Sequence, residues 1–286
     1  MARRIVRAES RARYYIRDEA RKRGWNTTHV ASGGNFLEEN EIVAHFPDIG
    51  LGLNRPDFLL CLGGDPVLVV EAKNHVNRID DAIQEATDYA DQINATGRYG
   101  VKVAVGAAGE EDTGFMVEVR FRSASAWVPL VSTGFPLTTI PSIRETELAL
   151  TADDGTTLVS VPASHEFIDA AIEISSILRA AKVEAPLRPK VIGAIVLAMY
   201  QGVIDTAATN ALASTNHLVE QAIITATDMV HEQQAKLIDA LRLSGADFDR
   251  LAPSINRVVS ILRRLNVRAV LQTDTDFLGM FYEAFL

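Results

Sequence analysis

The chain has very little cysteine: Cys61 is the only one among its 286 residues, and it lies inside an apolar run. A single cysteine excludes an internal disulfide framework and a zinc site built from several cysteines, and it fits a reducing compartment. Long apolar runs are also lacking, so the sequence predicts no membrane-spanning helix. The basic N-terminus has no apolar segment behind it, as a secretory signal would have. We therefore expect a cytoplasmic protein with no membrane partner.

Two nucleotide-binding patterns are missing as well. No G-x-x-x-x-G-K-[ST] run is present, so no P-loop for ATP is expected, and no G-x-G-x-x-G spacing marks a dinucleotide loop. The net charge of −9 argues weakly against a nucleic-acid partner, but residues 1–25 hold nine Lys and Arg against three Asp and Glu. A basic first helix on an acidic chain is consistent with a phosphate-facing edge, and equally with a solvated helix surface.

Residues 3–23 have the pattern of an amphipathic helix, and Gly24 is placed to end it. At 100° per residue, Glu9 falls inside the apolar stripe rather than on the polar face. A carboxylate turned toward a core needs a partner, which is either an arginine or a metal ion. The apolar stripe consists of Ile5, Ala12, Ile16 and Ala20.

The pattern from residue 25 to about 150 mixes strands and helices, which predicts a compact α/β sheet domain. Beyond about 150 the pattern is almost wholly helical, so we expect two domains, 1–150 and 151–286. Gly63-Gly64-Asp65-Pro66 is a turn between the first two strands, and Pro129 marks an edge strand. The expected strands are 57–62, 67–73, 101–106, 116–122 and 126–131, and the expected helices are 77–95, 165–183, 189–201 (containing the buried segment VIGAIVLAMY), 212–243, 247–265 and one that starts near 275.

Charged groups gather at the open end of the first hairpin. In an antiparallel pair centred on residues 63–66, Asp57 faces Glu71 or Lys73, and residues 71 and 73 share a face because side chains alternate. Two carboxylates that close repel each other unless a cation lies between them. Lys73 supplies one positive charge, and oxygen ligands from two carboxylates also suit Mg²⁺. Glu9 is a natural third carboxylate.

Such a site has the parts needed to hydrolyse a phosphodiester bond. A metal ion binds a phosphate oxygen and activates a water molecule, and a lysine orients that water and stabilises the developing charge. The alternative is a coincidental surface salt bridge at a strand end.

The residues Pro56-Asp57, with Glu71-Ala72-Lys73 beginning fourteen positions after Asp57, resemble the PD-(D/E)XK nuclease superfamily. Residues 8–25 and 55–74 are similar to the opening helix and the metal-binding core of the N-terminal nuclease domain of type I restriction-enzyme restriction subunits. The resemblance covers about residues 1–130. It implies a restriction-endonuclease-like fold, a mixed sheet flanked by helices. It also implies that Glu9, Asp57 and Glu71 bind Mg²⁺ or Mn²⁺, and that Asp57, Glu71 and Lys73 are catalytic.

Residues 82–93 resemble the helix that follows in this family, which carries a Gln-x-x-x-Tyr motif. The matching positions here are Glu85 and Tyr89, and Gln84 stands one residue earlier. Either Gln84 substitutes after a small shift, or Glu85 has a different role.

The final segment, DTDFLGMFYEAFL (274–286), resembles the stretch that leads into the catalytic domain of N6-adenine DNA methyltransferases. The helices before it resemble the N-terminal helical domain of those enzymes. An Asn-Pro-Pro-Tyr motif and a glycine-rich cofactor loop are both missing. We therefore expect the N-terminal fragment of a fused restriction–modification enzyme, with S-adenosylmethionine bound only by a missing C-terminal module. An amphipathic terminal helix without this role is the alternative.

Together these features predict a Mg²⁺-dependent endonuclease that cleaves duplex DNA and acts with methyltransferase and specificity modules or subunits. Arg11, Arg55 and His75 are candidate contacts to DNA phosphates, and ion pairs or solvent-exposed positions are the alternative for them. A catalytically inactive nuclease-fold scaffold with a helical DNA- or subunit-binding module is the rival function. The motif does not separate duplex DNA from RNA or single strands.

Overall fold

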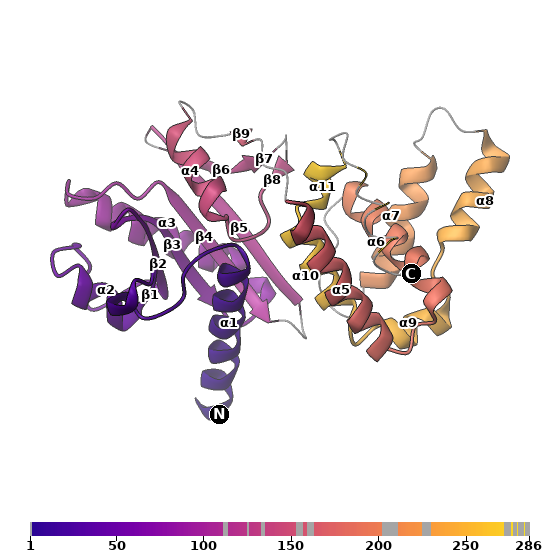
Figure 1. Cartoon of the computed structure of the whole chain (residues 1–286), viewed down its shortest axis with the longest axis horizontal. Helices are drawn as coiled ribbons and strands as arrows, with labels where there is room; N and C mark the ends of the chain where they lie inside the picture. Colours follow the sequence, from indigo (N-terminus) through magenta and orange to yellow (C-terminus); the bar gives the residue numbers. More distant parts are fainter. Residues whose placement is uncertain are drawn as a thin grey trace. The chain divides into compact units, whose positions relative to one another are not determined.

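The computed structural model describes residues 2–110, 114–124, 126–132, 135–152, 157–158, 163–201, 211–224 and 230–271, together with residues 276, 279 and 283. The chain divides into two compact units (Figure 1). The first consists of Met1–Glu110 and Phe115–Ser160, and the second of Glu111–Gly114 and Val161–Leu286.

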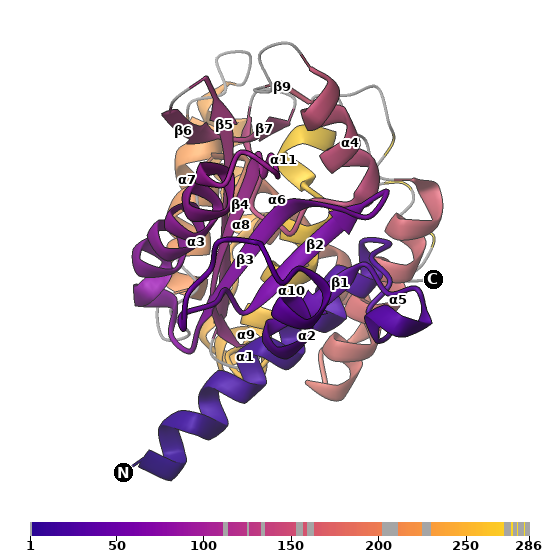
Figure 2. The same ribbon diagram turned by 90° about the vertical axis from the view of Figure 1, so that its left-hand side faces the viewer.

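A mixed sheet of six strands forms the centre of the first unit, in the order β1-β2-β3-β4-β5-β6 (Figures 1 and 2). The β1–β2 and β2–β3 pairs are antiparallel, whereas β3 and β4 are parallel. β6 lies at one edge beside β5, as Pro129 predicts, because proline has no N–H to donate to a further strand. The strands are β1 Phe36–Glu38, β2 Phe58–Leu62, β3 Asp65–Lys73, β4 Val103–Glu110, β5 Gly114–Ser123 and β6 Ala126–Pro129, and a small second sheet contains β7 Val131–Ser132, β8 Phe135–Pro136 and β9 Thr157–Leu158.

Helices cover both faces of the main sheet (Figure 2). The reason is that its strands carry buried apolar side chains on both faces. On one face, Ile16 of α1 belongs to the same buried cluster as Leu60 and Leu68. On the other face, α3 shares a cluster with Leu59 and Val69. The predicted α/β class is therefore confirmed. The helices are α1 Ala2–Lys22, α2 Glu39–His45, α3 Ile79–Ala95 and α4 Ile143–Thr151, with 3₁₀ turns at Val30–Ser32 and Val76–Arg78.

The turn of the β2–β3 hairpin is shorter than the four residues expected. Gly63 and Gly64 form it, both with positive φ, while Asp65 pairs with Leu62 and already belongs to β3. Glycine at both positions permits the backbone conformation that a two-residue hairpin turn needs.

A β-bulge changes the register of this hairpin. Cys61 pairs with Pro66 but Leu60 pairs with Leu68, so Val67 is the extra residue on β3. The shifted register then continues to Phe58 opposite Val70, which places Asp57 next to Glu71.

α3 packs very closely on β4 at Gly106. A Cβ atom at this position would lie 2.4 Å from the backbone nitrogen of Ile83, closer than real atoms approach. Gly106 pairs with Glu71 in the parallel ladder, so the close packing brings α3 toward the end of β3.

The end of α1 is tied to the start of α4. Gly24 has a φ of +92° and follows the helix, as predicted. Arg23 forms an ion pair with Glu145, and both side chains are only 4% exposed. Arg23 Nε also donates to the Ile140 carbonyl at 3.1 Å. Burial alone would raise the pKa of Glu145, but the guanidinium of Arg23 and the Ser142 N–H lower that pKa below its ordinary value.

The second unit is helical, as expected. The predicted buried helix at VIGAIVLAMY is confirmed, since Ile192, Ala194, Ile195 and Ala198 are at most 2% exposed. The helices are α5 Ser164–Ala180, α6 Arg188–Gln201, α7 Ala211–Ile224, α8 His231–Leu241, α9 Gly245–Leu251, α10 Ile255–Arg264 and α11 Val267–Val270, with a 3₁₀ turn at Ala185–Leu187.

Two of the predicted long helices are wrong. Residues 212–243 form α7 and α8 rather than one helix, because the backbone at Val230 is extended where α8 begins. Residues 247–265 contain α9 and α10, because Pro253 lacks the N–H that a continuous helix requires. The helix expected near 275 and the segment 274–286 lie outside the described residues, apart from 276, 279 and 283. Within the described part of the chain, no helix combines the length and the apolar character needed to cross a membrane.

Glu145→Ala is expected to lower the free energy of unfolding by about 3–5 kcal/mol, because it leaves the buried Arg23 without its carboxylate partner. Urea denaturation at neutral pH measures this. Glu147→Ala, at an exposed position of the same helix, is the matched control and should change stability by less than about 0.5 kcal/mol. Equal losses in both variants would contradict the role given to the ion pair.

Candidate active site

Asp57 and Glu71 lie beside each other at the open end of the β2–β3 hairpin. The Asp57 N–H donates to Glu71 Oε2 at 3.3 Å, and the Ala72 N–H donates to Asp57 Oδ2 at 2.9 Å. Each carboxylate is therefore held by the backbone of the opposite segment. The side chain of Asp57 is 13% exposed and that of Glu71 is 9% exposed.

Lys73 joins this pair from the same face of β3. Its Nζ lies 3.1 Å from Glu71 Oε1 and 2.5 Å from Glu85 Oε2, which comes from α3. Burial alone would lower the pKa of Lys73, but its hydrogen bond to Glu85 and the nearby Glu71 raise that pKa above its ordinary value. The side chain is therefore an ammonium group at neutral pH.

Arg13 of α1 is a second cation at this position, and the sequence reasoning missed it. Its Nη1 lies 3.4 Å from Asp57 Oδ1 and 3.7 Å from Glu39 Oε2, and its guanidinium lies 5.4 Å from the centre of the Phe58 ring. The available signal was its spacing, because Arg13 follows Glu9 by one helical turn.

Four carboxyl groups and two cations meet in this cluster. Asp57, Glu71, Glu85 and Glu39 supply the carboxyl groups, and Lys73 and Arg13 supply the cations. Burial, and then the Asp57 charge, raise the pKa of Glu71 to about 8, although Lys73 acts in the opposite direction. A further cation near Glu71 would relieve the repulsion.

The chemistry of these donors fits a hard divalent cation, which prefers carboxylate oxygens. Among the described residues, no three His, Cys, Asp or Glu side chains come together as a metal site. Asp57 and Glu71 thus provide a pair of carboxylates. Glu9, the expected third ligand, lies in α1 but its side chain is outside the described residues. Mg²⁺ accepts few protein ligands, because it keeps waters or substrate oxygens in its remaining positions.

Gln84 and Glu85 are the two candidates for the glutamine position of the Gln-x-x-x-Tyr motif, and their side chains lie in different places. Gln84 is exposed, and its Nε2 donates to Asp88 Oδ1 at 2.8 Å, so it does not reach the cluster. Glu85 does reach it, through Lys73. Tyr89 lies one turn beyond Glu85; burial and then the charges of Glu71 and Glu85 raise the pKa of its hydroxyl.

The three candidate contacts to DNA phosphates differ in their exposure. Arg55 is partly buried, and its Nε has no hydrogen-bond partner among the described residues. His75 is exposed, and its Nδ1 accepts a hydrogen bond from the Asn77 N–H at 3.4 Å. Arg11 is exposed on α1.

A pocket of about 560 Å³ adjoins the cluster, and we call it the α3 pocket. One wall is the loop of residues 52–54, and the other is the face of α3 that carries Glu85, Asp88, Tyr89 and Gln92. Glu85 belongs to both the cluster and the pocket, so the pocket borders the cluster.

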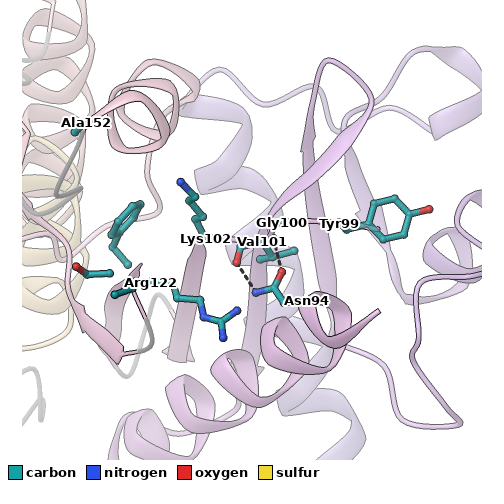
Figure 3. A pocket seen from close by; sticks show the side chains of 10 residues that line it. Asn94, Tyr99, Gly100, Val101, Lys102, Arg122 and Ala152 are labelled. Carbon is teal, nitrogen blue, oxygen red and sulfur yellow. Dashed lines mark hydrogen bonds between the residues drawn. The ribbon is translucent and has the colours of Figure 1, made fainter. Parts of the chain in front are cut away.

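A second pocket, of about 440 Å³, lies where β4 begins and β5 ends (Figure 3). Asn94 builds its wall by hydrogen bonds to both the N–H and the C=O of Val101. The charged ends of Lys102 and Arg122 point in different directions, so they do not converge on one anion (Figure 3). Because β3 and β4 are parallel, Lys102 is about six residues, or roughly 20 Å, from the level of Lys73. This pocket is separate from the cluster.

Residues 22–118 match the family model described as type I restriction enzyme R protein N terminus (HSDR_N). The matched segment is about a third of the chain and includes the hairpin, α3 and β4. It supports the resemblance to the N-terminal domain of restriction subunits. No curated protein and no solved structure gives a significant match to the chain.

The raised pKa of Glu71 predicts a pH-dependent stability in metal-free buffer. Between its ordinary value of 4.5 and about 8, the folded protein holds a proton that the unfolded chain releases, so stability falls as pH rises through this window. The contribution is at most about 1.4 kcal/mol per pH unit. Urea denaturation from pH 5 to about pH 8 with a chelator should show a steeper loss for the wild type than for Glu71→Gln. Identical slopes would mean that Glu71 is not perturbed.

Proposed function

We propose that the first unit is a metal-dependent endonuclease domain of a restriction enzyme and hydrolyses DNA phosphodiester bonds. The observation that carries this proposal is the convergence of Asp57, Glu71 and Lys73 at the end of β3. Their position inside the segment that matches the restriction-subunit family supports it.

Asp57 and Glu71 would hold Mg²⁺ or Mn²⁺ through their carboxylate oxygens, with Glu9 as the proposed third ligand. When bound, such an ion supplies positive charge to a phosphate oxygen and lowers the pKa of an attacking water. The backbone N–H groups of Asp57 and Ala72 orient the two carboxylates before any ligand arrives.

Lys73 acts as a charged donor in this proposal. Because it is protonated beside Glu71 and Glu85, it donates hydrogen bonds to the water or the phosphate and offsets the charge of the transition state, rather than removing a proton. Glu85 holds the ammonium in place, and Arg13 holds Asp57 from the other side.

The family match also suggests the partners. We propose duplex DNA as the substrate, and methyltransferase and specificity modules or subunits as partners, as in type I restriction enzymes. The helical second unit would be the part that connects to them, as the N-terminal helical domain of an adenine methyltransferase module. S-adenosylmethionine would bind only in that further module.

Plasmid cleavage with Mg²⁺ or Mn²⁺ tests the nuclease. Asp57→Ala and Lys73→Ala should each lower the cleavage rate by about a hundredfold or more, because each removes charge that the transition state needs. Asp65→Ala and Lys102→Ala remove the same charges at exposed positions and should cleave like the wild type. Equal cleavage by all five proteins would show a contaminating nuclease. If no protein cleaves, metal binding by the wild type that is lost in Asp57→Ala would indicate a nuclease domain that needs its partner modules or subunits, whereas absence of such binding would favour the scaffold function.

Substitutions at two neighbouring positions of α3 test whether Gln84 or Glu85 supports the site. Glu85→Ala should lower cleavage by about tenfold or more, because it frees the ammonium of Lys73, whereas Gln84→Ala should have little effect. Single-turnover cleavage rates of folded variants measure this. A larger loss in Gln84→Ala would mean that α3 shifts on binding DNA.

A further inference from the structure

The α3 pocket has walls that are held in place. Ile49 is 1% exposed and anchors the start of the loop in the core. Gly50 has a φ of +81°, and a Cβ atom there would lie 2.3 Å from Thr96 Cγ2, just beyond the end of α3. Only glycine lets the loop approach the helix so closely. The loop wall is therefore positioned by the fold before a ligand binds.

Three polar side chains line this pocket without using their hydrogen-bonding groups. Asn54 from the loop and Tyr89 and Gln92 from α3 make no side-chain hydrogen bond to the described part of the chain. Together they offer two amides and one hydroxyl, which both donate and accept. Leu53, at the same wall, is 95% exposed. The pocket thus combines free hydrogen-bonding groups with an apolar side chain.

The negative charge of the pocket lining disfavours the binding of a phosphate there. Glu85 and Asp88 line it, and the described lining residues include no Lys or Arg. The ammonium of Lys73 reaches Glu85 from the cluster side, and Gln84 bonds Asp88 from the helix surface. The part of a ligand that contacts this face of α3 must therefore be neutral or cationic rather than anionic. Carboxylate and amide oxygens accept hydrogen bonds from the exocyclic amines of nucleobases.

We propose that the α3 pocket receives one unpaired nucleobase, next to the phosphate that the cluster cleaves. Its volume of about 560 Å³ has room for a base with its sugar but is too small for a double helix. The DNA strand is therefore single-stranded or has an extruded base at the cut. This inference rests on the proposed function, because it makes the cluster the place of cleavage.

The experiment compares two single strands with the same number of phosphates: a short oligodeoxycytidylate, whose bases carry an exocyclic amine, and its fully abasic counterpart. Fluorescence anisotropy with the full chain is measured in Ca²⁺, to observe binding separately from cleavage. The wild type should bind the oligodeoxycytidylate about tenfold more tightly than the abasic strand, because only the former has bases to place in the pocket. Leu53→Ser and Gln92→Ala should bring this ratio close to one.

Val230→Ser and Gln233→Ala are the matched controls, since they make the same changes at exposed positions of the second unit. Both should keep the wild-type ratio. Equal affinity of the wild type for the two strands, or an unchanged ratio in Leu53→Ser and Gln92→Ala, would overturn the proposal. Failure of the nuclease itself is seen separately, as absence of Asp57-dependent plasmid cleavage in Mg²⁺.

Discussion

The β-bulge at Val67 is the constraint on which the candidate site depends. Without the extra residue, the two-glycine turn would pair Asp57 with Val70, whose side chain belongs to the core cluster beneath α1. A slip of one residue moves side chains to the opposite face of a sheet. The bulge instead sets Asp57 against Glu71, where the N–H groups of Asp57 and Ala72 hold both carboxylates. Burial of apolar side chains on both faces keeps this register, and so keeps two like charges together.

The close packing of α3 completes the arrangement. Gly106 has no side chain, so α3 approaches the sheet and brings Glu85 to Lys73. Lys73 then connects the end of β3 to the helix, and Arg13 connects Asp57 to α1. The cations only partly compensate for the buried carboxylates. Perturbed carboxyl groups of this kind are typical of sites that bind a charged ligand, because packing alone would not favour them.

Local sequence signals explain the long elements better than the short ones. The three-residue β1 and seven-residue α2 are too short to be stable alone, and the sequence pattern predicts neither. They form because β1 pairs with β2 and because Ile42 of α2 is buried. α4 was also missed, although Ser142 and Glu145 form a capping box at its start. In the second unit, helical periodicity continues across Val230, but the extended backbone there separates two helices.

The sequence by itself determined the two strands of the hairpin, the charged residues at its open end, and the helix that follows. Alternating apolar residues, turn glycines and a period of 3.6 are local properties, so the chain reveals them directly. Only the tertiary structure decided that Asp57 faces Glu71, that Glu85 rather than Gln84 meets Lys73, and that Arg13 joins them. It also decided that residues 52–54 face α3 across a pocket. These outcomes depend on register, a bulge and the approach of distant segments, and no local pattern encodes the distance between two parts of a chain.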